Sequence, residues 1–124
     1  MIQLDVEVPD RPGELARLLG ILAAESVNID AMSANSGAGH SYVSLITDRP
    51  IRARQSLRKA GYPCSQRTVL VVSVADEPGA FAALARRLGG AGVSIESVVH
   101  LESVGRRVQL AIGVDNRDAA RALV

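Results

Sequence analysis

A short turn motif occurs twice in this chain, and the sequence on both sides of it repeats as well. Asp10-Arg11-Pro12-Gly13 returns 66 residues later as Asp76-Glu77-Pro78-Gly79. An alternating apolar run precedes each copy, and apolar residues with helical spacing follow each copy. Val27-Asn28-Ile29 and Val93-Ser94-Ile95 then keep the same offset. Four features in one register predict an internal duplication of a small α/β unit.

The segments before the two motifs predict strands of different character. Residues 2–8 alternate strictly, with polar Gln3, Asp5 and Glu7 facing water and the apolar residues facing inward. Residues 69–75 are instead apolar on both faces. Because an exposed apolar sheet face or edge favours association, we expect a partner repeat, a partner chain or both to cover this second strand.

The segment after the first motif predicts a helix that runs to about Glu25. Asp10 is expected to be its N-cap, and Pro12 suits a first helical turn because its nitrogen needs no hydrogen-bond partner. The apolar residues recur with helical spacing and predict a stripe that faces the core. This stripe consists of Leu15, Leu18, Leu19, Leu22 and Ala23.

Three further elements complete the first copy. Strands are expected at about 28–35 and 41–47, joined by a hairpin loop at 36–39. A helix that begins near Pro50 is expected to turn three apolar side chains inward, namely Ile51, Ala53 and Leu57. A fourth strand in residues 62–67 gives the order β-α-β-β-α-β, the split βαβ or ferredoxin-like arrangement.

The second copy predicts the same order with one strand fewer. Its expected elements are a strand at 68–75, a helix at 78–91, strands at 94–103 and 107–114, and a last helix from about Asn116. The sequence therefore predicts an α+β fold of two ferredoxin-like repeats, 1–66 and 67–124. Each has an antiparallel sheet with helices on one face, and the second repeat lacks its last strand.

The length of the chain bears on assembly. At 124 residues it fits one ordinary domain or two very small ones. Units of this size bury only about 60% of their chain surface and are marginally stable alone. We therefore expect tight packing of the repeats on each other or a homodimer.

The composition excludes several classes of protein. No apolar run approaches the roughly 20 residues that cross a bilayer, and the first residues lack a signal peptide. The single cysteine, Cys64, cannot form an internal disulfide, so a cytoplasmic location is expected. A net charge of +1 and three aromatic residues argue against binding of nucleic acid.

These residues resemble the ACT domain family. The resemblance rests on Asp10-Arg11-Pro12-Gly13-Glu14-Leu15 with Ser26-Val27-Asn28-Ile29-Asp30 in the first copy, and on Asp76–Gly79 with Gly92–Glu96 in the second. It implies a βαββαβ fold for the repeats. It also implies a regulatory module that binds a small ligand, most often an amino acid, at an interface between ACT units. The sequence shows no Ser-His-Asp arrangement, metal cluster or phosphate loop, so neither catalysis nor a cofactor is expected.

Carried over residue by residue, the resemblance implies two candidate ligand sites. The first consists of Asp10, Arg11, Pro12, Gly13, Asn28 and Ile29, where Asn28 is contributed by a neighbouring unit or chain. The second consists of Asp76, Pro78, Gly79, Ser94 and Ile95. Ser94 lacks the amide of Asn28, and Glu77 in place of Arg11 makes the second turn less favourable for an anion. If only one site binds ligand, we expect it to be the first.

The residue types suit an amino-acid zwitterion. Asp10 could accept hydrogen bonds from the ammonium group, while backbone amides of residues 12–14 hold the carboxylate and Asn28 donates and accepts. Two simpler interpretations stay open. Asp10 and Asp76 could serve only as helix caps, and Asn28 could serve only to end the connection between helix and strand.

The remaining candidate residues favour structural roles. His40, His100 and Cys64 lack neighbours at metal-ligand or catalytic spacing. The basic residues of the second helix indicate a solvated face or a docking surface: Arg52, Arg54, Arg58 and Lys59. Catalysis like that of acylphosphatase could use an arginine and an asparagine such as Arg11 and Asn28. However, Pro12 removes an amide donor from the loop.

Two functions follow from the sequence. The first is a regulatory module that binds an amino acid between ACT units, with a homodimer and a partner enzyme as expected partners. The alternative is a ligand-free docking protein that regulates or stabilises a partner enzyme. The second apolar strand and the missing last strand favour this alternative, because both require a partner.

Overall fold

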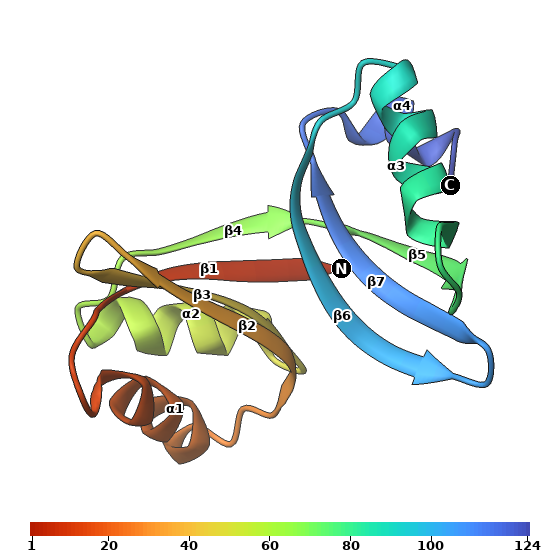
Figure 1. Cartoon of the computed structure of the whole chain (residues 1–124). Coiled ribbons are helices and arrows are strands. Elements are labelled where there is room, and N and C mark those ends of the chain that lie inside the picture. Colours follow the sequence, from red (N-terminus) through yellow and green to blue (C-terminus); the bar gives the residue numbers. More distant parts are fainter. The chain divides into compact units, whose positions relative to one another are not determined.

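Seven strands and four helices form two compact units in the computed structural model, which describes residues 1–124 (Figure 1). Residues 2–67 form one unit, and residues 68–124 together with Met1 form the other. None of the four helices has the length and apolar character needed to cross a membrane.

The first unit has the predicted ferredoxin-like order. Its elements are β1 (Ile2–Pro9), α1 (Glu14–Ala24), β2 (Ile29–Gly37), β3 (His40–Thr47), α2 (Pro50–Lys59) and β4 (Cys64–Thr68). The sheet order is β2-β3-β1-β4, and β1 pairs antiparallel with β3, with Leu4 opposite Leu45 and Val6 opposite Val43. Both helices lie on one face of this sheet (Figure 1). The predicted fold is therefore confirmed for this unit.

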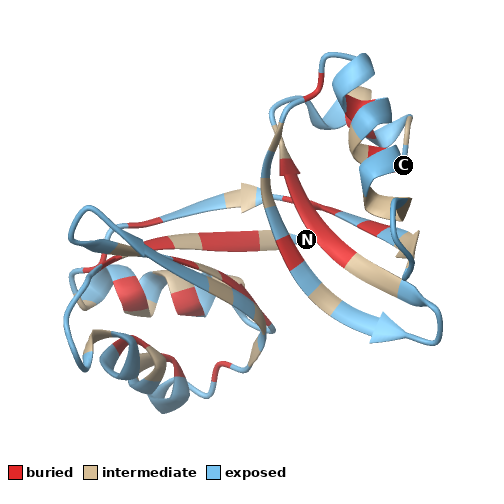
Figure 2. Cartoon of the chain, in the orientation of Figure 1, coloured by how far each residue is buried: buried red, intermediate tan, exposed pale blue.

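The core of the first unit lies between this sheet and its helices. Leu18 and Leu22 of α1 and Ala53 and Leu57 of α2 are fully buried, and the apolar residues of β1 pack against them (Figure 2). Burial of these faces explains why the sequence alternates in β1 and has helical spacing in α1.

Four sequence predictions about side-chain orientation are wrong. Ile51 is 68% exposed, because it lies about 200° around the helix from buried Ala53. Leu15, in the first turn of α1, is 40% exposed, and Ala23 is also exposed. Gln3 was expected to face water but is fully buried, and its amide donates a hydrogen bond to Asp5 Oδ1 at 2.9 Å. It belongs to an interior strand with neighbours on both sides.

The second unit confirms the predicted loss of one strand. Its elements are β5 (Leu70–Ala75), α3 (Ala80–Gly90), β6 (Ile95–Val104), β7 (Arg107–Val114) and α4 (Arg117–Arg121). The three strands have the order β5-β7-β6, so β5 is an edge strand, whereas its counterpart β1 is flanked on both sides. The last helix begins directly after Asn116, close to the expected start, and the Asn116 side chain caps it by accepting a hydrogen bond from the Ala119 amide at 3.1 Å.

Candidate functional site

The two turn motifs have the same backbone conformation. Gly13 (φ 87°, ψ −13°) and Gly79 (φ 85°, ψ −10°) adopt the left-handed conformation that glycine tolerates best. Each residue directly precedes a helix and accepts a hydrogen bond from the amide four residues on, at 2.9 Å from Arg17 and 3.0 Å from Ala83. The sequence repeat is therefore a repeat of local structure.

The prediction that Asp10 caps the first helix is wrong. Gly13 is the N-cap of α1, and no side chain caps this helix. Asp10 lies three residues too early. Its amide donates to the Gly39 carbonyl at 3.2 Å, and its carboxylate accepts a hydrogen bond from Ser36 Oγ at 3.4 Å. In the second unit the N-cap of α3 is likewise Gly79 and not Asp76. Asp10 is thus exposed beside the β2–β3 hairpin.

A hollow of about 240 Å3 lies at the first turn. Its walls come from the end of β1, the turn, the first turn of α1 and the β2–β3 hairpin. The lining residues are Val8, Pro9, Asp10, Arg11, Glu14, Leu15, Ala34, Ser36, Ser41 and Val43. Asp10 and Arg11 of the predicted first site are thus brought together, whereas Pro12 and Gly13 belong to the same turn without lining the hollow.

Four of the residues that line this hollow were not predicted to belong to a site, namely Glu14, Leu15, Ser36 and Ser41. Glu14 and Leu15 directly follow the turn motif, but Leu15 was assigned to the core stripe. Ser36 and Ser41 flank the predicted hairpin loop, and their hydroxyls lie 2.8 Å apart. The proximity of the hairpin to the turn was the missing information, because it depends on how β3 pairs with β1.

The predicted cradle of backbone amides is largely absent. Pro12 has no N–H group, and the Glu14 amide donates to the Arg11 carbonyl at 3.2 Å. Of the amides of residues 12–14, only that of Gly13 is therefore left to hold a ligand carboxylate. The cationic group that lines the hollow is instead the guanidinium of Arg11.

Asn28 and Ile29 lie at the other end of the sheet. Asn28 directly precedes β2, and Ser36 lies eight residues further along this strand, or about 26 Å at 3.3 Å per residue. The Asn28 amide donates to Asp48 Oδ1 at 2.8 Å, and the Asp48 amide donates to the Asn28 carbonyl at 3.1 Å. Within one unit, Asn28 therefore ties β2 to the end of β3, and the two halves of the predicted site do not meet.

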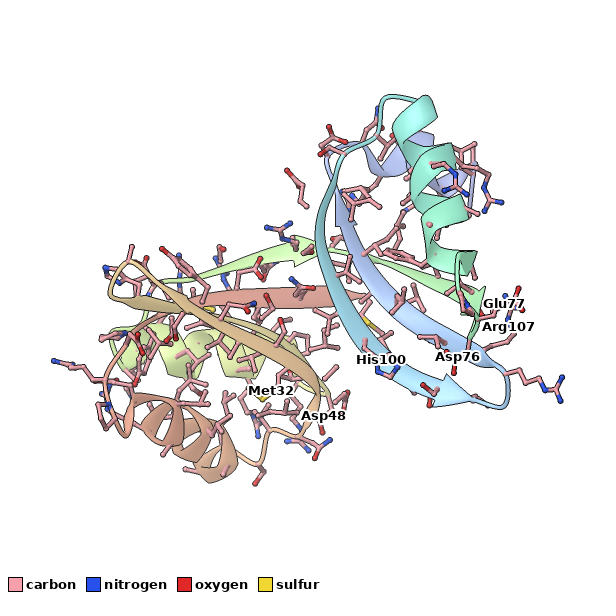
Figure 3. The ribbon with its side chains drawn as sticks, in the orientation of Figure 1. Met32, Asp48, Asp76, Glu77, His100 and Arg107 are labelled. Carbon is pink, nitrogen blue, oxygen red and sulfur yellow. The ribbon has the colours of Figure 1, made fainter.

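The second candidate site keeps the backbone of the first but changes its side chains. The Ser94 amide donates to Asp115 Oδ1 at 2.9 Å, which repeats the Asn28–Asp48 contact, and Ile95 begins β6 as Ile29 begins β2. Asp76, Glu77 and Arg107 lie together near the turn that contains Pro78 and Gly79 (Figure 3). The Arg107 guanidinium, however, donates to the Ser73 side chain and carbonyl at 2.8 and 3.0 Å.

A network of charged and phenolic groups surrounds Glu14 in the first unit. Arg11 Nη2 donates to Glu14 Oε1 at 2.7 Å, and the Tyr62 hydroxyl donates to Glu14 Oε2 at 3.1 Å. Arg17 donates to the Tyr62 oxygen at 2.8 Å, and its guanidinium lies 5.0 Å from the centre of the Tyr62 ring. The hydrogen bond from Arg11 lowers the pKa of Glu14, and Tyr62 adds to this effect. A lowered folded-state pKa means that the network stabilises the fold near neutral pH, and that this stabilisation is lost as the pH falls through that pKa.

Other groups are poorer candidates for a site. A larger hollow of about 410 Å3 lies over β1, β3 and β4, but its Asp5 carboxylate already accepts hydrogen bonds from Gln3, Ser44 and Arg67. Burial raises the pKa of the Cys64 thiol, which disfavours the reactive thiolate. No three His, Cys, Asp or Glu side chains gather in a way that could hold a metal ion.

Comparison with known proteins places these features in a family. A model of the ACT domain family matches residues 2–54. No protein of curated function matches the chain significantly. A crystal structure of a protein from Bacteroides thetaiotaomicron is similar over 98% of this chain and 84% of that chain, with 23% identity and a TM-score of 0.87.

The regulatory subunit of aspartate kinase from Thermus thermophilus is also similar. The match covers 98% of this chain and 89% of that chain, with 19% identity and a TM-score of 0.71. The same subunit from Thermus flavus gives the same values. At these identities the likeness shows the fold. Residues 2–54 of the first unit therefore match the ACT domain, and the second unit repeats the strand and helix order of the first without its last strand.

Proposed function

We propose that the chain is a regulatory module that binds a free amino acid in the hollow at the first turn. The observation that carries this proposal is the set of groups around that hollow. Asp10 and Glu14 offer carboxylates, Arg11 a guanidinium, and Ser36 and Ser41 hydroxyls. Pockets for drug-sized ligands measure about 300–1,000 Å3, so a hollow of about 240 Å3 suits a single small amino acid. ACT domains are regulatory modules that bind amino acids, which agrees with this assignment.

In this proposal the hollow is one half of the site. Asp10 contacts the ligand ammonium, and Asn28 of a second copy of the chain contacts the ligand from the other side. A ligand held at such an interface shifts the equilibrium between assembly states when it prefers one of them. A homodimer or a partner enzyme in the cytoplasm is the expected recipient of this signal. The chain itself is assigned binding, not catalysis.

Thermal unfolding in the presence of each of the twenty amino acids tests the proposal. A ligand that binds only the folded state stabilises it by about 2.7 kcal/mol at a hundredfold excess over its dissociation constant. We expect the unfolding midpoint to rise with one chemical class of amino acid at millimolar concentration. An unchanged midpoint with all twenty would contradict the proposal.

One observation favours the alternative of a ligand-free docking protein. The edge strand β5 carries Val71, which is 44% exposed, and no strand occupies the position that β4 holds beside β1. An uncharged edge strand is a template for pairing with another chain. If no amino acid shifts the midpoint, docking of a partner enzyme along β5 becomes the better hypothesis.

A further inference from the structure

The network around Glu14 is present only in the first unit, although the turn beside it is present in both. Sixty-six residues later, Arg11 is replaced by Glu77, Glu14 by Ala80 and Arg17 by Ala83. The left-handed glycine and the hydrogen bonds of the turn are nonetheless the same in the second unit. The ACT turn therefore folds without these charges, so their role in the first unit is not explained by the fold.

The two members of the Arg11–Glu14 ion pair differ in how firmly they are held. The Arg11 side chain is 67% exposed and forms an ion pair with Glu14. The Glu14 side chain is 15% exposed and has a second support, the hydroxyl of Tyr62, which is itself fixed by Arg17. Arg11 can thus rotate away into solvent or toward a ligand, while Glu14 stays in place.

We propose that a bound amino acid breaks the Arg11–Glu14 ion pair and binds both side chains itself, an inference that rests on the function proposed above. The ligand carboxylate binds the Arg11 guanidinium, and the ligand ammonium binds Glu14 together with Asp10. Tyr62 is a positioning residue, because it keeps Glu14 at the hollow when Arg11 leaves.

This exchange selects zwitterions by charge. A carboxylic acid without an amino group would occupy Arg11 and leave Glu14 without its cation beside Asp10. An amine without a carboxylate would bind Glu14 and leave Arg11 without its anion. Only a ligand with both charges replaces both halves of the pair. The carboxylic acid leaves the partly buried Glu14 without a cation, and the amine forgoes the ion pair with Arg11.

Calorimetric titration with three matched compounds tests the exchange. They are the amino acid that stabilises the protein, the carboxylic acid that lacks its amino group, and the amine that lacks its carboxylate. In the unaltered protein we expect the amino acid to bind at least about tenfold more tightly than either analogue, as for a lost charge-assisted hydrogen bond. In Glu14→Gln the ratio of the affinity for the amino acid to that for the carboxylic acid should fall to about threefold or less. In Arg11→Gln the ratio of the affinity for the amino acid to that for the amine should fall in the same way.

Two further variants test whether the effect is specific to Glu14 and to its contact with Tyr62. Glu25→Gln removes a carboxylate just beyond the other end of α1 and should leave both ratios unchanged. Tyr62→Phe keeps the ring but loses the hydroxyl, and it should weaken amino-acid binding while carboxylic-acid binding changes less. If an amino acid binds and Glu14→Gln keeps the full discrimination, the exchange is wrong and the proposed function stands. If no amino acid binds at all, the proposed function itself fails.

Discussion

Leu18→Ala is expected to lower the free energy of unfolding by about 2–5 kcal/mol, which is the usual cost of emptying a well-packed core position. Leu18 is fully buried between α1 and the sheet of the first unit. Leu15→Ala, one turn earlier on the same helix, should cost about 1 kcal/mol or less, because its side chain is 40% exposed. Urea or thermal unfolding of both variants measures the difference.

The contrast between these two leucines tests the assignment of Leu15 to the wall of the hollow. The sequence pattern places both in one apolar stripe, and the structure separates them. If Leu15→Ala destabilised the protein as much as Leu18→Ala, Leu15 would belong to the core and the hollow would lose one of its walls.

Asp10→Ala is expected to abolish stabilisation by the amino acid, which amounts to about 2.7 kcal/mol at a hundredfold excess over the dissociation constant. The variant should unfold near the midpoint of the unaltered protein without ligand, because Asp10 is exposed and does not cap α1. Thermal unfolding with and without the ligand measures both effects.

Asp76→Ala is the matched control for this loss. Asp76 occupies the same position in the second turn, where Glu77 and Ala80 replace Arg11 and Glu14. We expect this variant to keep the full ligand effect. Loss of stabilisation in Asp76→Ala but not in Asp10→Ala would move the ligand to the second unit.

The fold was predictable because hydrophobic periodicity and an internal repeat both constrain it. Apart from Gln3, the alternation in β1 matches the buried face, as does the helical spacing of Leu18 and Leu22 in α1, and the second unit repeats the element order of the first. Periodicity is less informative in the first turn of a helix. Leu15 lies there with the spacing of the buried stripe and is nonetheless 40% exposed, whereas the exposure of Ile51 follows from its angle of about 200° to Ala53 around the helix.

The candidate site was only partly predictable, because the distances within it depend on tertiary structure. The rule that aspartate caps helices suggested a role for Asp10, but the left-handed Gly13 starts the helix three residues later. Asn28 was expected to reach the ligand from a neighbouring unit or chain, and within one unit β2 separates it from the turn by its full length. The contact of Glu14 with Tyr62 joins residues 48 positions apart, and no local pattern predicts it.

The most direct test of a ligand site at the first turn is an amide chemical-shift titration of the ¹⁵N-labelled protein with the amino acid that raises its unfolding midpoint. We expect five amide resonances to move with a single dissociation constant, namely those of Asp10, Arg11, Glu14, Ser36 and Ser41. Those of Asp76 and Glu77, at the matching second turn, should stay in place. Movement confined to the second turn, or spread over the edge strand β5 with the first turn unchanged, would contradict it.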